Sequence, residues 1–168
     1  MPRLQAPRRT RPLGPAETEL RGYRLLGVVA ALVVAIDQAT KTLALESLSD
    51  GGVDLFGGFV TLRITINSGG AFGVLQGVPG FFLLATIGII VGILLWARNV
   101  EHRAWLTALG LVLGGGLGNV IDRVVRDHGG VVDFVDLHWW PVFNVADACI
   151  VTGVGLLLLL SARGEKEE

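Results

Sequence analysis

Long apolar segments separated by short polar ones make up most of the chain. Four segments are apolar enough for a membrane-spanning helix, which needs about 20 residues. They cover about residues 23–45, 80–97, 104–121 and 141–162. The second carries no charged residue, and the apolar part of the fourth carries only Asp147. We therefore predict a four-helix membrane domain over residues 23–162.

A different pattern occupies the stretch between the first two segments. Apolar and polar residues alternate from Phe59 to Ile66, and a period of two is typical of a strand. Glycine pairs before and after this run supply turns. A second extended run, residues 131–135, carries Asp133 among apolar residues. We expect a small β region over about residues 53–72 that lies as a cradle at the membrane surface.

The composition agrees with a membrane protein and excludes other classes. Hydrophobic residues make up 51% of the chain and charged residues 17%, with a mean hydropathy of +0.60. Soluble domains usually carry about 25% charged residues. A single cysteine excludes an intrachain disulfide scaffold, and the length leaves no room for a large soluble domain.

The distribution of basic residues predicts the orientation. Residues 1–22 are rich in arginine and proline and have no apolar run, so we expect a disordered basic tail. This tail, the turn at residues 98–103 and the tail at residues 163–168 share the cytoplasmic side under the positive-inside rule. The predicted fold class is an all-α integral membrane protein with four transmembrane helices and a small extracytoplasmic β-cradle.

A cleaved signal peptide is an alternative interpretation of the N-terminal region. Basic residues followed by the apolar run from Leu25 to Ile36 resemble such a peptide. Asp37 and Lys41 stand where small residues and a cleavage site are expected, so the sequence favours a retained span.

Ionisable residues near the apolar segments are the candidates for chemistry. Placing one within a bilayer costs roughly 2.5 to 3.5 kcal/mol, so such residues are usually functional. The chain has no serine-hydrolase, zinc-protease or P-loop motif. Carboxylates that qualify by position are Asp37, Asp122, Asp133, Asp136 and Asp147.

The third apolar segment combines a packing face with polar residues. Glycines repeat at every fourth position from Gly110 to Gly118, which lets another helix approach closely. Asn119, Asp122 and Arg123 follow at i, i+3 and i+4 and share one side of the helix. Two interpretations stay open: a polar site, or a structural ion pair in which Arg123 neutralises Asp122.

The fourth segment repeats this arrangement. Pro141 is suited to the first position of a helix, and Asn144 and Asp147 follow with i, i+3 spacing. They either cap the helix and favour its dipole or belong to a site. Asp133 is either a solvated loop residue or a carboxylate held beside the helices. Two carboxylates at a partly dehydrated site would share a proton and supply an acid and a base, which is aspartic protease chemistry.

Three other hypotheses stay open. Four outer residues could hold a metal ion, although their spacing is not a strong ligand signature: His128, Asp133, Asp136 and His138. A proton-coupled or ion transporter would use a polar pathway of Asp37, Lys41, Asp122 and Asp147. The inner halves of the later segments have few polar groups to continue such a pathway. A non-enzymatic scaffold would explain the glycines but not the Asp and Asn pairs.

The chain also contains five motifs in a specific order. They are Asp37-Gln-Ala-Thr-Lys41, Asn67-Ser-Gly-Gly-Ala-Phe72, Gly115-Gly-Leu-Gly-Asn-Val-Ile-Asp-Arg123, Val132-Asp-Phe134 and Phe143-Asn-Val-Ala-Asp-Ala-Cys-Ile150. Their order and content closely resemble the lipoprotein signal peptidase (signal peptidase II) family of bacteria. The resemblance covers about residues 23–160.

The resemblance implies an aspartic endopeptidase of the bacterial inner membrane, with both termini cytoplasmic and the active site near the outer face. Such an enzyme removes the signal peptide from diacylglyceryl-modified prolipoproteins by cutting just before the lipidated Cys. By the resemblance, Asp133 and Asp147 are the catalytic dyad, and Asp37 and Lys41 form a supporting polar pair. Substrate-binding and supporting residues would be Asn67, Gly69, Phe72, Asn119, Asp122, Arg123 and Asn144.

The expected partners are the prolipoprotein substrates and membrane lipids, without nucleic acid. We expect a monomer that uses no cofactor and no metal ion. The sequence does not assign the acid and base roles within the dyad, because coupled carboxylates titrate as a pair.

Overall fold

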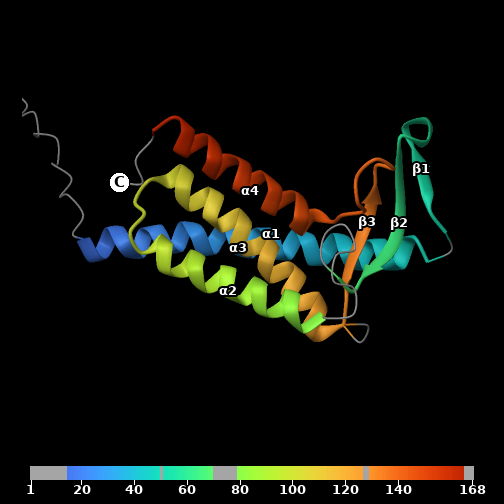
Figure 1. The fold of residues 1–168 in the computed structure, drawn as a ribbon, viewed down its shortest axis with the longest axis horizontal. Coiled ribbons are helices and arrows are strands. Elements are labelled where there is room, and N and C mark those ends of the chain that lie inside the picture. Colours follow the sequence, from blue (N-terminus) through green and yellow to red (C-terminus); the bar gives the residue numbers. More distant parts are fainter. Residues whose placement is uncertain (1–14, 50, 70–78, 127–128, 165–168) are drawn as a thin grey trace, which may run out of the picture.

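The computed structural model describes residues 15–49, 51–69, 79–126 and 129–164. Its helices are α1 (Pro15–Ser47), α2 (Pro79–Ala97), α3 (Arg103–Val125) and α4 (Val145–Ala162). Its strands are β1 (Val53–Leu55), β2 (Val60–Asn67) and β3 (Val131–Asp136), and a 3-10 turn, η1 (Phe56–Gly58), follows β1. The helices lie alongside one another, and the sheet stands across one end of them (Figure 1). The start of α1 and the end of α4 lie at the other end (Figure 1).

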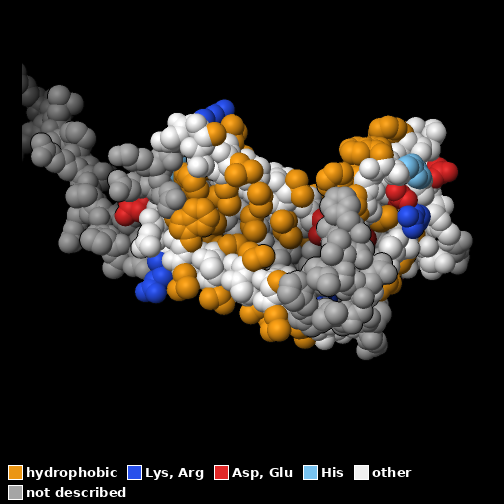
Figure 2. Space-filling view, viewed as in Figure 1, with side chains coloured by type: hydrophobic (Ala, Val, Ile, Leu, Met, Phe, Trp, Pro, Cys, Tyr) orange, Lys and Arg blue, Asp and Glu red, His pale blue; other side chains and the backbone are white. Residues whose placement is uncertain are grey.

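Three of the helical stretches in the described residues are long and apolar enough to cross a membrane: Gly22–Ser47, Arg103–Val125 and Val145–Ala162. The stretch Leu83–Ala97 of α2 is apolar but shorter. Hydrophobic side chains cover the middle of the helical body on the face seen in Figure 2, whereas the charged side chains lie toward its two ends. This distribution suits a chain whose middle faces lipid and whose ends face water.

The start of α1 corrects one sequence-based boundary. The predicted disordered tail extends through residue 22, but the helix begins at Pro15. Proline is favoured at the first helical position, and the alanine, glutamates and leucine that follow are good helix formers. The expectation of disorder is therefore wrong for residues 15–22, and residues 1–14 lie outside the described part of the chain.

The start of α4 corrects a second sequence-based boundary. Pro141 was expected to open this helix, but α4 begins at Val145 and Asn144 is its N-cap. Phe143 instead pairs with Val135 in an antiparallel bridge, and their backbone N–H and C=O groups exchange hydrogen bonds of 3.0 and 2.9 Å. An extended Phe143 is incompatible with a helix starting at Pro141, because these two bonds need extended backbone.

The three strands form one antiparallel sheet in the order β1-β2-β3. The alternating run at residues 59–66 thus forms the predicted strand, β2, and the extended run at residues 131–135 lies in β3. Thr65 lies opposite Asp133 in the register of β2 and β3, and Asn67 lies opposite Val131. Because side chains two residues apart share a face of a strand, this register places Asn67 diagonally beside Asp133.

Helix α3 packs against the other three helices, and its glycines make this possible. A Cβ added at Gly114 would lie 2.8 Å from the Ala30 carbonyl oxygen of α1. One added at Gly110 would lie 2.9 Å from Val29 Cβ of the same helix. The predicted packing role of these glycines is confirmed, since neither position has room for a side chain.

Candidate active site

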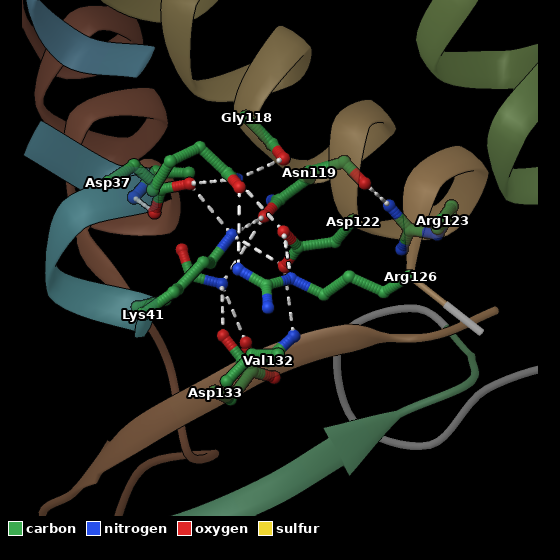
Figure 3. A network of polar contacts seen from close by, with 12 residues as sticks. Asp37, Lys41, Gly118, Asn119, Asp122, Arg123, Arg126, Val132 and Asp133 are labelled. Atoms are coloured by element: carbon green, nitrogen blue, oxygen red, sulfur yellow. Dashed lines mark hydrogen bonds and ion pairs between the residues drawn. The ribbon is translucent and has the colours of Figure 1, made fainter. Parts of the chain in front are cut away.

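The polar residues singled out in the sequence meet where α1, α3, α4 and β3 come together, at the sheet end of the helices (Figure 3). Asp133 comes from β3, Asp147 from the first turn of α4, and Asn119 from α3. A cavity of about 240 Å³ is lined by both carboxylates, together with Asn67, Gly69, Asn119, Arg123 and apolar residues that include Trp140 and Phe143. The structure therefore brings the predicted pair of carboxylates to one cavity.

Asp133 is almost completely removed from solvent, with 1% of its surface exposed. Asn144 Nδ2 donates to its Oδ1 over 2.6 Å, and Asn67 Nδ2 donates to its Oδ2 over 3.1 Å. Burial raises the pKa of this carboxyl to about 7, and the negative charge of Asp147 adds to the shift. The interpretation of Asp133 as a solvated loop residue is wrong, and its proton affinity suits a group that exchanges protons near neutral pH.

Asp147 and Asn144 form a capping box at the start of α4. The Asp147 N–H donates to Asn144 Oδ1 over 2.9 Å, and the Asn144 N–H donates back to Asp147 Oδ2 over 3.3 Å. The capping interpretation of this pair is thus confirmed. The same two side chains also reach the site, because Asn119 Nδ2 donates to Asp147 Oδ1 over 2.8 Å and Asn144 contacts Asp133.

Lys41 is the centre of a buried charged network beside the carboxylates (Figure 3). Its Nζ lies 2.8 Å from Asp37 Oδ2 and 2.9 Å from Asp122 Oδ2, and all three side chains are fully buried. Asp37 Oδ1 also accepts the backbone N–H of Ala146 at the start of α4 over 2.9 Å. The network therefore connects α1, α3 and α4 with paired charges, which is how a buried charge becomes tolerable.

Two further residues complete this network and were not singled out in the sequence. Arg126 Nε lies 3.1 Å from Asp122 Oδ1, and Gln38 Nε2 donates to the same oxygen over 2.9 Å. The available signal for Arg126 was its position four residues after Asp122, where helical side chains meet. Gln38 stands within the first polar motif, but its sequence neighbours do not indicate its partner on α3.

Arg123 is not the counterion of Asp122, which was one of the two interpretations that the sequence left open. Its Nη1 donates to the Asn119 carbonyl oxygen over 3.2 Å, and its Nη2 donates to the Gly69 carbonyl oxygen over 3.4 Å. The structural ion pair between Arg123 and Asp122 is therefore wrong, since Lys41 and Arg126 hold that carboxylate. Arg123 instead joins the end of α3 to the segment after β2 and lines the cavity.

Asp136 lies apart from the cavity. It accepts the His138 backbone N–H over 2.7 Å and pairs with Arg63 over 2.6 Å. These hydrogen bonds, that from His138 first, hold the pKa of the Asp136 carboxyl below its usual value. Within the described ranges, no group of three His, Cys, Asp or Glu residues is arranged to hold a metal ion. His128 of the metal hypothesis and Phe72 of the predicted site lie outside the described residues.

The arrangement of the motifs agrees with comparisons of the chain with known proteins. A family model described as signal peptidase (SPase) II matches residues 29–163. The chain belongs to the signal peptidase II family. A lipoprotein signal peptidase of Rhodococcus jostii (strain RHA1) is 43% identical over 145 residues, which cover 83% of this chain and 73% of that protein. One from Mycobacterium avium (strain 104) is 42% identical over 155 residues, which cover 89% of this chain and 85% of that protein.

Solved structures of bacterial membrane enzymes have the same fold. One, determined in meso at 2.3 Å resolution, has a TM-score of 0.72 and 31% identity, and covers 85% of this chain and 92% of that one. Another, at 1.9 Å resolution, has a TM-score of 0.70 and 31% identity, and the match covers 80% of this chain and 90% of that one. This signal peptidase II family member is therefore a peptidase and a multi-pass membrane protein, and the family is of the aspartic class.

Proposed function

We propose that this chain removes the signal peptide from diacylglyceryl-modified prolipoproteins, by hydrolysing the peptide bond just before the lipidated Cys. The observation that carries the proposal is the pair of carboxylates, Asp133 and Asp147, on one cavity at the end of an apolar helix bundle. The lipoprotein signal peptidases that resemble the chain over most of its length support the choice of substrate.

The dyad hydrolyses the bond without a covalent intermediate. One carboxylate takes a proton from water as the water oxygen attacks the scissile carbonyl carbon, and the other, protonated carboxyl gives its proton to the carbonyl oxygen. The tetrahedral product then loses a hydroxyl proton to the second carboxylate as its C–N bond breaks. The first carboxyl gives its proton to the departing amine nitrogen, which restores the starting protonation of both groups.

The surrounding polar residues hold this pair and the substrate. Amide N–H groups of Asn67, Asn119 and Asn144 reach the two carboxylates and restrict their orientation. Arg123 and the Gly69 backbone line the cavity where the substrate peptide would lie. The site is supported by Asp37, Lys41 and Asp122. Their ion pairs and hydrogen bonds connect α1, α3 and α4, the helices that carry residues of the site.

An apolar hollow beside the dyad fits the lipid part of the proposed substrate. Its volume is about 340 Å³, and its lining includes Leu137, Trp139, Trp140, Phe143, Asp147 and Val151. Four of these residues also line the dyad cavity, so the two spaces adjoin. A diacylglyceryl group could enter from the bilayer and leave the scissile bond at the carboxylates.

The orientation of the chain belongs to the same proposal. The chain resides in the bacterial inner membrane as a monomer, with both termini cytoplasmic and the sheet outside. Arginines near the start of α1 and in the turn between α2 and α3 support this direction under the positive-inside rule. Asp133 lies in a strand of the sheet and Asp147 in the first turn of α4, so the dyad would then act near the outer face.

Asparagine substitutions test the dyad. D133N and D147N are each assayed, as folded detergent-purified proteins, for cleavage of a diacylated prolipopeptide. We expect each to lose at least about 100-fold in turnover, because each removes one proton-transfer group. D136N is the matched control, since Asp136 is on the same strand as Asp133 but outside the cavity. Turnover retained by folded D133N or D147N would contradict the proposed catalytic role of the two carboxylates. Ion flux through the protein in proteoliposomes would instead favour a transporter.

A further inference from the structure

The orientation of the Asn119 amide is determined by Lys41. An ammonium group can only donate, and the three groups within its reach are Asp37 Oδ2, Asp122 Oδ2 and Asn119 Oδ1, the last at 3.1 Å. Asn119 must therefore turn its oxygen toward Lys41. Its Nδ2 then faces Asp147 and donates to Oδ1 over 2.8 Å. A cation is thus connected to Asp147 through one amide.

The side-chain amides that donate to Asp133 accept hydrogen bonds from uncharged backbone N–H groups, not from an ammonium group. Asn144 accepts the backbone N–H of Asp147 at its Oδ1, so its Nδ2 faces the site, where it donates to Asp133, to Asn119 Oδ1 and to the Val132 carbonyl oxygen. Asn67 accepts the backbone N–H of Gly69 over 3.1 Å, and its Nδ2 also faces Asp133. Only the amide that serves Asp147 has its oxygen against an ammonium group, among the described residues that contact the two carboxylates. Such contact makes an amide N–H a stronger donor to a carboxylate.

We propose that Lys41, acting through Asn119, holds Asp147 as the ionised member of the dyad, so that Asp147 is the base and Asp133 the acid. The inference rests on the proposed dyad and adds the division of roles within it. Lys41 is a positioning residue, because it is fully buried and its hydrogen-bonded connection to Asp147 runs through Asn119. In this assignment the proton of the attacking water passes to Asp147, and the carbonyl oxygen receives its proton from Asp133.

The other charges around Asp147 leave this asymmetry in place. The charged groups on the elements packed against it are Asp37 and Lys41 of α1, Asp122, Arg123 and Arg126 of α3, and Asp133 of β3. Both carboxylates of the network are paired with Lys41, and Arg123 lines the cavity beside both members of the dyad.

Titration of one carboxyl at a time tests the assignment. In D133N only Asp147 of the dyad can titrate, and in D147N only Asp133 can, so infrared difference spectra of each carboxyl against pH give two midpoints. We expect Asp147 in D133N to lose its proton at a lower pH than Asp133 in D147N. The reverse order, or equal midpoints, overturns the assignment of Asp147 as base and Asp133 as acid. If both variants are inactive, either result still leaves the proposed dyad in place, so the dyad and the assignment of roles can fail separately.

A charge-balanced double variant tests the part played by Lys41. D37N/K41M removes one anion and one cation from the network, and R126Q is the control, because Arg126 contacts Asp122 but not Asn119. Losing the ammonium group should move the acidic limb of the kcat profile upward by about one pH unit, since Asp147 then holds its proton to higher pH. R126Q should leave this limb in place.

An unmoved acidic limb in the folded double variant overturns the role of Lys41, and so does an equal shift in R126Q. If D37N/K41M does not fold, N119L replaces it, because leucine of similar size removes the amide and keeps the ion pairs of Lys41 with Asp37 and Asp122. The same upward shift is then expected in N119L, and its absence contradicts the proposal.

Discussion

Asp133 shows how burial changes the chemistry of one side chain. Its pKa of about 7 lies well above the usual value of an aspartate, first because the side chain is buried and then because the negative charge of Asp147 is close. The folded protein therefore binds this proton more tightly than the unfolded chain does. Protonation of Asp133 contributes stability at low pH, and the contribution is lost as the pH rises through the unfolded value toward about 7.

The stability of D133N should consequently depend less on pH than that of the wild type. Asparagine stays neutral, so the wild-type Tm should fall relative to that of D133N between about pH 5 and about pH 7. D136N is the control, because the pKa of Asp136 is lowered and its carboxyl is ionised across that window. Thermal unfolding in detergent measures all three proteins, and parallel curves for wild type and D133N would contradict a buried, proton-binding Asp133.

At the scale of elements, the start of α4 unites a helix cap with the candidate site. Asn144 caps the helix through Oδ1 and contacts Asp133 through Nδ2. The bridge between Val135 and Phe143 keeps the preceding residues extended, so the helix cannot begin earlier. One side chain therefore both caps the start of α4 and holds the Asp133 carboxylate.

Substitution of Asn144 should separate these two roles. N144A should lose about 1 kcal/mol or more of stability together with most of the activity, since cap and amide both disappear. A serine hydroxyl also caps helices but is too short to replace the amide at Asp133. N144S should therefore regain thermal stability over N144A without regaining turnover. Recovery of activity together with stability would show that Asn144 acts only as a cap.

The close contact of α3 with α1 gives a second test at this scale. G114A places a Cβ 2.8 Å from the Ala30 carbonyl oxygen and should destabilise the protein by about 1–3 kcal/mol. G116A is the matched control, because its Cβ would meet Thr86 Cγ2 at 3.5 Å, an ordinary contact. Thermal unfolding of the two variants in the same detergent makes the comparison. Equal stability of G114A and G116A would mean that α1 and α3 can move apart without a loss of free energy, which would contradict the close-packing role of Gly114.

For the whole molecule, the separation of the two ends matters most. The start of α1 and the end of α4 lie at one end, and the sheet lies at the other (Figure 1). Apolar side chains cover the middle of the visible helical face (Figure 2). A bilayer around that middle would place the sheet and the dyad on one side of the membrane and the start of α1 on the other.

Cysteine labelling in whole cells tests the orientation of these ends. In a C149A background, F59C places a thiol at an exposed position just before β2, and A162C places one at the exposed end of α4. A membrane-impermeant maleimide should label F59C in intact cells and A162C only after permeabilisation. The opposite pattern would invert the proposed orientation.

Much of this architecture could be predicted from the sequence because it depends on local periodicity. Long apolar segments indicated the helices, alternation indicated β2, and glycines at every fourth position indicated the packing face of α3. The i, i+3 spacing of Asn144 and Asp147 likewise indicated a helix start. The five motifs also indicated the family, and the family model that matches residues 29–163 confirms it.

Only the tertiary structure decided which partners these residues have. Spacing along α3 placed Arg123 beside Asp122, yet Asp122 is held by Lys41 from another helix and by Arg126. Periodicity identifies the residues that share one face of a helix, but not the side chain that the neighbouring helix brings to that face. The cap at Asn144 was similarly decided by the bridge from Val135, a long-range backbone contact. The sequence by itself determined the elements and the family, whereas packing between distant segments determined the charges around the dyad.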